Sequence, residues 1–365
     1  MEAWEAAKNA LECVLEAVHG ESIVIVCDDE KREIGKAFAD GALAIGLWTR
    51  LMILKTSDKT RTEVPPQLLE VLTQQKPDIY INLMRGGGKE TPFRMKIIQI
   101  ETRDHKSRLG HCPGVTLDML TKGALALTPQ EHRNMQGFAA RLIQALTGTV
   151  KVEIINPSGT KLSLNVQGRE FYTDTRIDWK TMKWMNLPTG EVIVAPIENS
   201  LNGKLVCDMA IGGIGPLKTP LEVSAENGKA KETSSKDRDV LRRVRETLAT
   251  DEWSNIVGEF AFGINPKARF TEEFLEAEKM LGTIHIAFGH NTDMPGGKNA
   301  SKNHMDLLIP KPTVKATKDN GTILIILEDG HSRFDPQHLQ TGNPDLLAWR
   351  ERETHTRTGS SLGIL

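Results

Sequence analysis

In the first part of the chain, short apolar runs alternate with segments of helical pattern. Residues 22–27 form a continuous apolar run, which is typical of a buried parallel strand. Residues 31–46 then carry an apolar side chain every three or four positions, which predicts an amphipathic helix. The same patterns predict further strands at residues 51–54, 78–83 and 97–101, and helices at residues 66–73 and 130–146. This alternation predicts an α/β domain with a parallel sheet.

From about residue 150 the pattern changes to short strands separated by turns. Turn-forming residues at 156–159 and 167–168 are typical of antiparallel hairpins. Strands are predicted at residues 152–155, 162–166, 170–173, 191–195, 203–208, 283–288, 305–309 and 322–327, and helices at residues 235–250 and 271–280. The predicted fold class is therefore α/β, with an N-terminal parallel-sheet α/β domain (residues 1–148), a C-terminal α+β domain (149–330) and a polar C-terminal extension (331–365).

The composition excludes several classes of protein. The 365 residues are enough for two domains, and 46 basic against 48 acidic residues give a formal net charge of −2. A nucleic-acid-binding protein would show a basic excess, and no run approaches the roughly 20 apolar residues that cross a bilayer. The cysteines are scattered, which indicates reduced thiols. We therefore expect a cytoplasmic protein that binds neither nucleic acid nor membrane.

Two histidine-containing segments carry the clearest chemical signal. His304 and Asp306 are two positions apart on a predicted strand, so both side chains project from the same face. His285 interrupts an otherwise apolar predicted strand. Each feature alone also fits a structural role, but only a glycine-rich loop (residues 291–303) separates the two segments, and it can bring the strand ends together. These three side chains are therefore candidate metal ligands.

Two upstream carboxylates fit the same site. Glu191 opens a predicted strand, and Glu259 lies within an apolar segment. A buried carboxylate is costly unless it is paired or bound to a cation, so Glu259 is a candidate ligand. The alternative is a buried salt bridge between Glu259 and Arg269 or Lys267.

Two imidazoles and three carboxylates favour particular metals. This donor set suits zinc, cobalt or manganese better than calcium or magnesium. Carboxylates can bridge a pair of ions, and such a pair would activate a water molecule between them. The pattern therefore predicts a metal-dependent hydrolase.

Five motifs in the second half of the chain point to a known family. They are N-L-P-T-G-E (186–191), A-P-I-E-N-S (195–200), G-E-F-A-F-G-I-N-P (258–266), E-K-M-L-G-T-I-H-I-A-F-G (278–289) and H-M-D (304–306). Over about residues 150–330 the chain resembles the aminopeptidase T and aminopeptidase S family, thermophilic metallo-aminopeptidases of leucyl aminopeptidase type. The resemblance over the N-terminal domain is weaker.

The resemblance implies a function and a ligand set. In the family, two divalent metal ions are held at the positions of Glu191, Glu259, His285, His304 and Asp306. It implies hydrolysis of the N-terminal peptide bond of small peptides by a metal-activated water, and a homodimer. Glu191 and Glu259 are also expected to take part in catalysis.

One family residue is replaced. The peptidases carry a tyrosine seven residues after the first ligand histidine, and this chain has Thr292 there. His290, two residues earlier, is expected to act in its place as a catalytic hydrogen-bond donor.

Three further residues are candidates for substrate binding. His105 and His111 follow a predicted strand of the first domain, where open α/β sheets place their ligands. Arg269 is a candidate for binding a substrate carboxylate.

Two other functions remain open. The same superfamily contains a non-haem iron dioxygenase that opens the dihydroxypyridine ring with a two-histidine, one-carboxylate triad. In that branch the position of Glu259 is a histidine and the positions of Glu191 and His285 are apolar, so this chain is closer to the peptidases. The third hypothesis is a non-catalytic protein that binds amino acids or peptides.

Overall fold

The computed structural model describes residues 1–56, 60–74, 76–86, 90–103, 107–178 and 184–335. Its first part is built on a five-stranded sheet with the order β2-β1-β3-β4-β8. All four strand pairs in this sheet are parallel. The strands are β1 (Ser22–Asp28), β2 (Trp48–Leu54), β3 (Ile79–Leu83), β4 (Arg108–His111) and β8 (Trp184–Asn186). The fold class predicted from the alternating pattern is confirmed.

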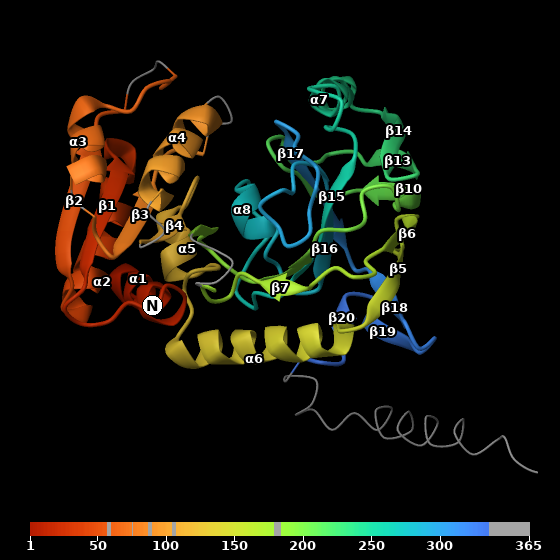
Figure 1. Cartoon of the computed structure of the whole chain (residues 1–365), viewed down its shortest axis with the longest axis horizontal. Coiled ribbons are helices and arrows are strands. Elements are labelled where there is room, and N and C mark those ends of the chain that lie inside the picture. The colour runs from red at the N-terminus through yellow and green to blue at the C-terminus, as the bar shows by residue number, and fades with distance from the viewer. Residues whose placement is uncertain (57–59, 75, 87–89, 104–106, 179–183, 336–365) are drawn as a thin grey trace, which may run out of the picture.

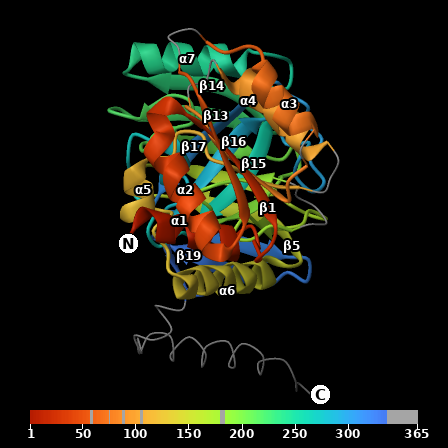
Figure 2. The ribbon, with the colours of Figure 1, turned by 90° about the vertical axis from the view of Figure 1, so that its left-hand side faces the viewer.

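Helices cover both faces of this sheet. The strands alternate their side chains between two apolar clusters. Helices α1 (Ala3–Cys13) and α2 (Arg32–Ile45) contribute to one cluster, and α3 (Pro66–Gln74) and α4 (Thr91–Thr102) contribute to the other. Figure 2 shows α1 and α2 on one side of β1, and α3 and α4 on the other. The short helices η1 (Asp29–Lys31) and α5 (Leu117–Thr121) complete this part.

The prediction of a strand at residues 97–101 is wrong, because these residues lie in α4. Its buried side chains include Phe93, Ile97 and Glu101, which are four residues apart and therefore share one helical face. Pro92 fits the first turn of this helix, where a proline removes no intrahelical hydrogen bond. The fourth strand is β4 instead.

The second part contains two antiparallel sheets. One has eight strands in the order β14-β13-β10-β6-β5-β18-β19-β20, and the other has seven in the order β12-β11-β17-β16-β15-β9-β7. The first set is β5 (Thr149–Ile155), β6 (Lys161–Asn165), β10 (Asn202–Cys207), β13 (Leu221–Glu226), β14 (Lys229–Ser235), β18 (Thr313–Lys318), β19 (Ile323–Glu328) and β20 (His331–Ser332). The second set is β7 (Tyr172–Thr173), β9 (Glu191–Val194), β11 (Ala210–Ile211), β12 (Gly215–Pro216), β15 (Val257–Gly263), β16 (Thr283–Gly289) and β17 (His304–Pro310).

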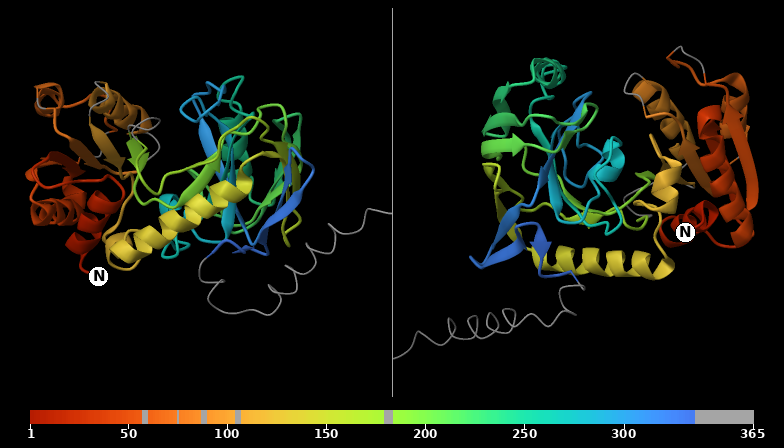
Figure 3. Two further views of the ribbon diagram at one scale, coloured as in Figure 1. Left: turned by 60° about the horizontal axis from the view of Figure 1, so that its bottom comes forward. Right: turned by 180° about the vertical axis from the view of Figure 1, so that it is seen from behind.

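One apolar core lies between these sheets. It contains alternate residues from the strands of both sheets. The helix α6 (Pro129–Leu146) adds the side chains of its buried face. Thr128 and Glu131 form a capping box at the start of α6, which fixes where this helix begins. In Figure 1 and in the right-hand view of Figure 3, α6 runs beneath both parts of the molecule. The helices α7 (Arg238–Leu248) and α8 (Phe274–Ala277) complete the second part.

The chain returns to the first sheet after β7. Strand β8 pairs with β4, although it lies far beyond the predicted boundary at residue 148. That boundary itself falls between α6 and β5. The predicted C-terminal extension begins with β20, which pairs with β19, and residues 336–365 lie outside the described part. None of the described helices combines the length and apolar character needed to span a bilayer.

Candidate metal centre

Four adjacent strands place five predicted side chains on one face of the seven-stranded sheet. Glu191 comes from β9, Glu259 from β15, His285 from β16, and His304 and Asp306 from β17. Most of the residues opposite them on neighbouring strands are small, which leaves space above the sheet; these are Gly263, Ala261, Ala287 and Gly289, while Leu308 also pairs with His285. The strands' other face packs into the core.

An extra residue in β15 turns Glu259 away from the core. The pairing with β16 shifts register between Val257 and Glu259, which leaves Gly258 as a β-bulge. Because side chains alternate along a strand, the bulge lets Val257 and Phe260 both enter the core while Glu259 faces the other side. A Cβ atom at Gly258 would lie 2.4 Å from the carbonyl oxygen of Gly289, so the close strand approach requires glycine.

The five side chains form two overlapping groups that share Glu259. Nε2 of His285 lies 3.1 Å from Oε1 of Glu259, 3.6 Å from Oε1 of Glu191 and 3.9 Å from Oδ1 of Asp306. Nε2 of His304 lies 3.2 Å from Oε2 of Glu259 and 3.1 Å from Oδ1 of Asp306. Each carboxylate oxygen of Glu259 therefore faces a different imidazole. The salt bridge from Glu259 to Arg269 or Lys267, considered as an alternative, is absent among these described contacts.

The donor atoms fit a divalent cation. Nδ1–H of His304 donates to the carbonyl oxygen of His290 (2.8 Å), which leaves Nε2 as an acceptor facing two carboxylates. Facing acceptors repel unless a proton or a cation lies between them. Oε1 of Glu191 is buried and accepts no hydrogen bond from the described residues. A cation between these atoms would satisfy them together.

The charges in this group are strongly coupled. Burial lowers the pKa of His285, but the hydrogen bond with Glu259 and the charge of Glu191 outweigh it and raise the pKa to about 10. Burial raises the pKa of Glu259, and its hydrogen bonds with both imidazoles reverse this effect and lower it. The negative carboxylates thus hold positive charge at the imidazoles, as they would hold a cation.

A buried lysine next to this group was missed by the sequence reasoning. The ammonium group of Lys279 contacts the Glu191 carboxylate and lies 3.1 Å from Oε1 of Glu278 and 3.5 Å from Oδ2 of Asp174. Burial lowers the pKa of Lys279, but these three carboxylates outweigh it and raise the pKa. Lys279 lies within the motif at residues 278–289, but nothing in the local pattern indicates that its side chain is buried.

The group opens into a cavity of about 570 Å³ between the two parts of the molecule. Met95 and Thr102 of α4 and Trp184 of β8 line it from the first part. Six carboxylates and one lysine, Lys279, are among the described residues that line it. Such a cavity is the size of a small-molecule site and favours a cationic group.

His290 lines the cavity, but both of its ring nitrogens face other groups. Nδ1 lies 3.1 Å from the carbonyl oxygen of Ser301, and Nε2 lies 3.2 Å from Oγ1 of Thr292 and 3.7 Å from Oδ1 of Asp293. Thr292, which stands at the family's tyrosine position, thus contacts His290.

Two of the three predicted substrate-binding residues, Arg269 and His111, are not among the described residues that line this cavity. Arg269 is held elsewhere, because its guanidinium contacts Asp118 (2.6 Å) and Glu276 (3.2 Å). His111 is buried behind Trp184, which lines the cavity. The two rings pack edge-on with their centroids 6.1 Å apart. Burial lowers the pKa of His111 to about 3, so its ring stays neutral. His105 lies outside the described residues.

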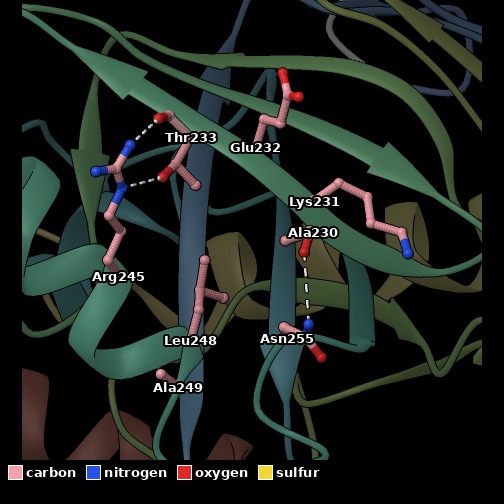
Figure 4. Close-up of a pocket in the computed structure, with 8 residues that line it drawn as sticks. All are labelled: Ala230, Lys231, Glu232, Thr233, Arg245, Leu248, Ala249 and Asn255. Atoms are coloured by element: carbon pink, nitrogen blue, oxygen red, sulfur yellow. Dashed lines mark hydrogen bonds between the residues drawn. The ribbon is translucent and has the colours of Figure 1, made fainter.

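A second hollow of about 520 Å³ lies against β14 and α7 (Figure 4). Its polar groups bond one another: Arg245 donates to Oγ1 (3.0 Å) and to the carbonyl oxygen (2.9 Å) of Thr233. None of the predicted site residues is among the residues that line it. The cavity above the seven-stranded sheet is therefore the candidate functional site.

Comparisons with known proteins show which proteins the chain is similar to. The model of the thermophilic metalloprotease (M29) family matches residues 130–331, which contain all five side chains. Wild-type AmpT from Thermus thermophilus has a similar structure (TM-score 0.65, 17% identity, 91% of this chain and 99% of that chain). So does 2,5-dihydroxypyridine dioxygenase from Pseudomonas putida KT2440 (TM-score 0.61, 14% identity, 90% of this chain and 96% of that chain). No curated protein sequence matches the chain.

Proposed function

The chain belongs to the thermophilic metalloprotease (M29) family, and from this premise we propose that it is an aminopeptidase that removes the N-terminal residue of small peptides. The family resemblance expected from the motifs is confirmed, and a metalloprotease requires a divalent metal. The aminopeptidase specificity, the number of ions and their identity are parts of the proposal.

One observation carries the proposal: the five side chains from four strands converge around Glu259 at one end of the cavity. Glu191, Glu259 and His285 would hold one cation, and Glu259, His304 and Asp306 would hold a second. Zinc, cobalt or manganese suits these nitrogen and oxygen donors. A divalent cation there would supply a nucleophilic water at neutral pH and polarise the scissile carbonyl.

The side chains around this group would bind and orient the peptide. The excess of carboxylates attracts the positive α-ammonium group of a peptide, which supports exopeptidase activity. Met95, Trp184 and Met294 give the cavity an apolar wall for a substrate side chain. A Glu191 or Glu259 oxygen that is not engaged by a cation would accept the proton that water releases.

The similarity to a dioxygenase structure supports a second candidate function. Its fold resembles this chain, and two histidines with one carboxylate are available here in His285, His304 and Glu259. The two additional carboxylates, Glu191 and Asp306, support the peptidase instead, because they provide ligands for a second ion.

The test measures the peptidase activity of the full-length protein as a function of the metal that it contains. The protein is stripped with a chelator, reloaded with zinc, cobalt, manganese or (without oxygen) ferrous iron, and assayed with leucyl anilides and a dipeptide library. We expect hydrolysis that depends on added metal and that spares N-acetylated peptides. Glu259→Gln is expected to lower activity by at least about 100-fold and to reduce the metal bound per chain. Glu232→Gln, an exposed glutamate at the hollow of Figure 4, is the control and should change neither.

Either of two results would contradict the proposal that the protein is a peptidase. Oxygen uptake with dihydroxylated pyridines in the iron-loaded protein, without peptide hydrolysis, would establish the dioxygenase. Binding of amino acids or peptides without turnover by any metal form would establish a binding protein. The homodimer and the cytoplasmic location remain predictions from the sequence.

A further inference from the structure

Tyr172 presents its phenol to the cavity. It lies on β7, directly opposite Ile193 of β9 in an antiparallel pair. Paired residues on neighbouring strands share a face, and Ile193 is two positions from Glu191, so all three side chains face the cavity. Tyr172 and the five candidate ligands line the same cavity, which places the phenol near the candidate metal centre.

The hydroxyl of Tyr172 is a free hydrogen-bond donor. No described residue forms a hydrogen bond with it. Two other donors near the metal centre are engaged: Lys279 by its carboxylates, and His290 by Ser301 and Thr292. A phenol is protonated at neutral pH and therefore donates.

This arrangement leaves the hydroxyl available to a ligand. The Tyr172 side chain is half-buried and its hydroxyl is not among the fully buried polar atoms, so it can bond water in the free protein and a substrate group that displaces this water. A polar group in the wall of a cavity, without a partner among the described residues, is placed to orient what enters the cavity. Tyr172 is therefore placed for a contact with the substrate.

We propose that Tyr172 is a catalytic residue whose hydroxyl donates a hydrogen bond to the carbonyl oxygen of the scissile peptide bond. This inference rests on the proposed peptidase function. In that reaction a water oxygen bonds to the carbonyl carbon, and the carbonyl π electrons move onto oxygen. The C–N bond then breaks and a proton from water ends on the released amine. Tyr172 stabilises the negative oxygen between these steps and keeps its own proton.

The first test is Tyr172→Phe in the metal-loaded, full-length enzyme. We expect kcat to fall by about 100- to 1,000-fold, as for loss of an oxyanion donor, with KM changed by less than about 3-fold. The melting temperature and the bound metal should not decrease. Tyr80→Phe is the matched control, because Tyr80 is the second of the chain's two tyrosines and is buried in the first sheet's core.

A spectroscopic readout tests the contact without turnover. Protein labelled with 3-fluorotyrosine should give two ¹⁹F resonances, and Tyr172→Phe assigns them. Titration of the metal-loaded protein with a dipeptide analogue carrying a tetrahedral phosphinic acid at the scissile position should shift the Tyr172 resonance and leave that of Tyr80 in place.

The outcomes separate the two proposals. Wild-type protein that hydrolyses peptides, with kcat of Tyr172→Phe within about 3-fold of it, would overturn the role of Tyr172 alone. An unshifted Tyr172 resonance at saturating phosphinic analogue would do the same. Wild-type protein that hydrolyses no peptide with any metal would overturn the proposed function itself.

Discussion

Lys279 and Glu191 form an ion pair inside the protein, beside the candidate metal centre. Both side chains are almost completely buried, at 3% and 5% exposure. The ammonium group also faces Asp174 and Glu278, so one positive charge balances several negative ones. This lysine orients the Glu191 carboxylate, whose other oxygen faces His285.

Replacing Lys279 with methionine is expected to destabilise the fold. The change leaves the surrounding carboxylates buried without a cation, which costs about 3 to 5 kcal/mol when a buried pair is broken. Lys315→Met, at an exposed lysine on β18, should change stability by less than about 0.5 kcal/mol. Thermal and urea unfolding of the chelator-treated proteins measure both. Equal stability of the two variants would show that the ion pair contributes little.

Gly258→Ala is expected to disrupt the bulge that presents Glu259. The added methyl group would meet the carbonyl oxygen of Gly289 at 2.4 Å, so β15 or β16 must shift. We expect a loss of about 1 to 3 kcal/mol and at least about 10-fold weaker zinc binding, measured by unfolding and by calorimetry. Gly137→Ala provides the control: on α6 a new methyl group meets only Arg141 at 3.4 Å, and stability should stay equal or rise. Unchanged zinc affinity in Gly258→Ala would argue against a role for the bulge.

The buried carboxyl group of Glu101 is expected to make the stability of the folded protein depend on pH. Burial raises its pKa from 4.5 to about 8, so the folded protein keeps a proton that the unfolded chain releases. The stabilisation is complete below pH about 4.5 and is lost as the pH rises to about 8, at about 1.4 kcal/mol per pH unit. Glu101→Gln removes this titration and keeps an oxygen for the Asn82 amide (2.7 Å).

The expected result is that Glu101→Gln and wild-type protein melt at similar temperatures at pH 4.5, while the variant melts higher at pH 8. Scanning calorimetry across this range measures the difference. Glu252→Gln, at an exposed glutamate, should follow the wild-type profile. A constant difference between Glu101→Gln and wild type at every pH would rule out the raised pKa as its cause.

The apolar wall predicts a preference for large apolar side chains in the substrate. Met294 lines the cavity beside the metal centre, so Met294→Ala removes contact area for such a side chain. We expect kcat/KM for leucyl anilides to fall by about 10-fold and that for alanyl anilides to stay within about 3-fold. The alanyl substrate is thus an internal control. An equal loss on both substrates would mean that Met294 supports the site and does not select the substrate.

Features with a local signature could be predicted from the sequence. The continuous apolar run at residues 22–27 and the helical spacing at residues 31–46 correspond to β1 and α2. Residues of the candidate metal centre were proposed for a similar reason, because polar side chains interrupt apolar strands at Glu259 and His285. His304 and Asp306 share a face because strand side chains alternate.

Features that depend on distant contacts could not be predicted in this way. The run Ile97–Ile98 fits a strand as well as a helix, and only packing against the sheet shows that it belongs to α4. The pairing of β8 with β4 joins segments far apart in the chain.

The sequence by itself thus determined the fold class, the family and the five side chains of the candidate metal centre. The tertiary structure decided which other groups surround them: it brought Lys279 to Glu191, turned Tyr172 into the cavity and held Arg269 away from it. The physical reason is that side-chain alternation is set by neighbouring residues, whereas charge pairing and burial depend on the strands and helices that pack around each position.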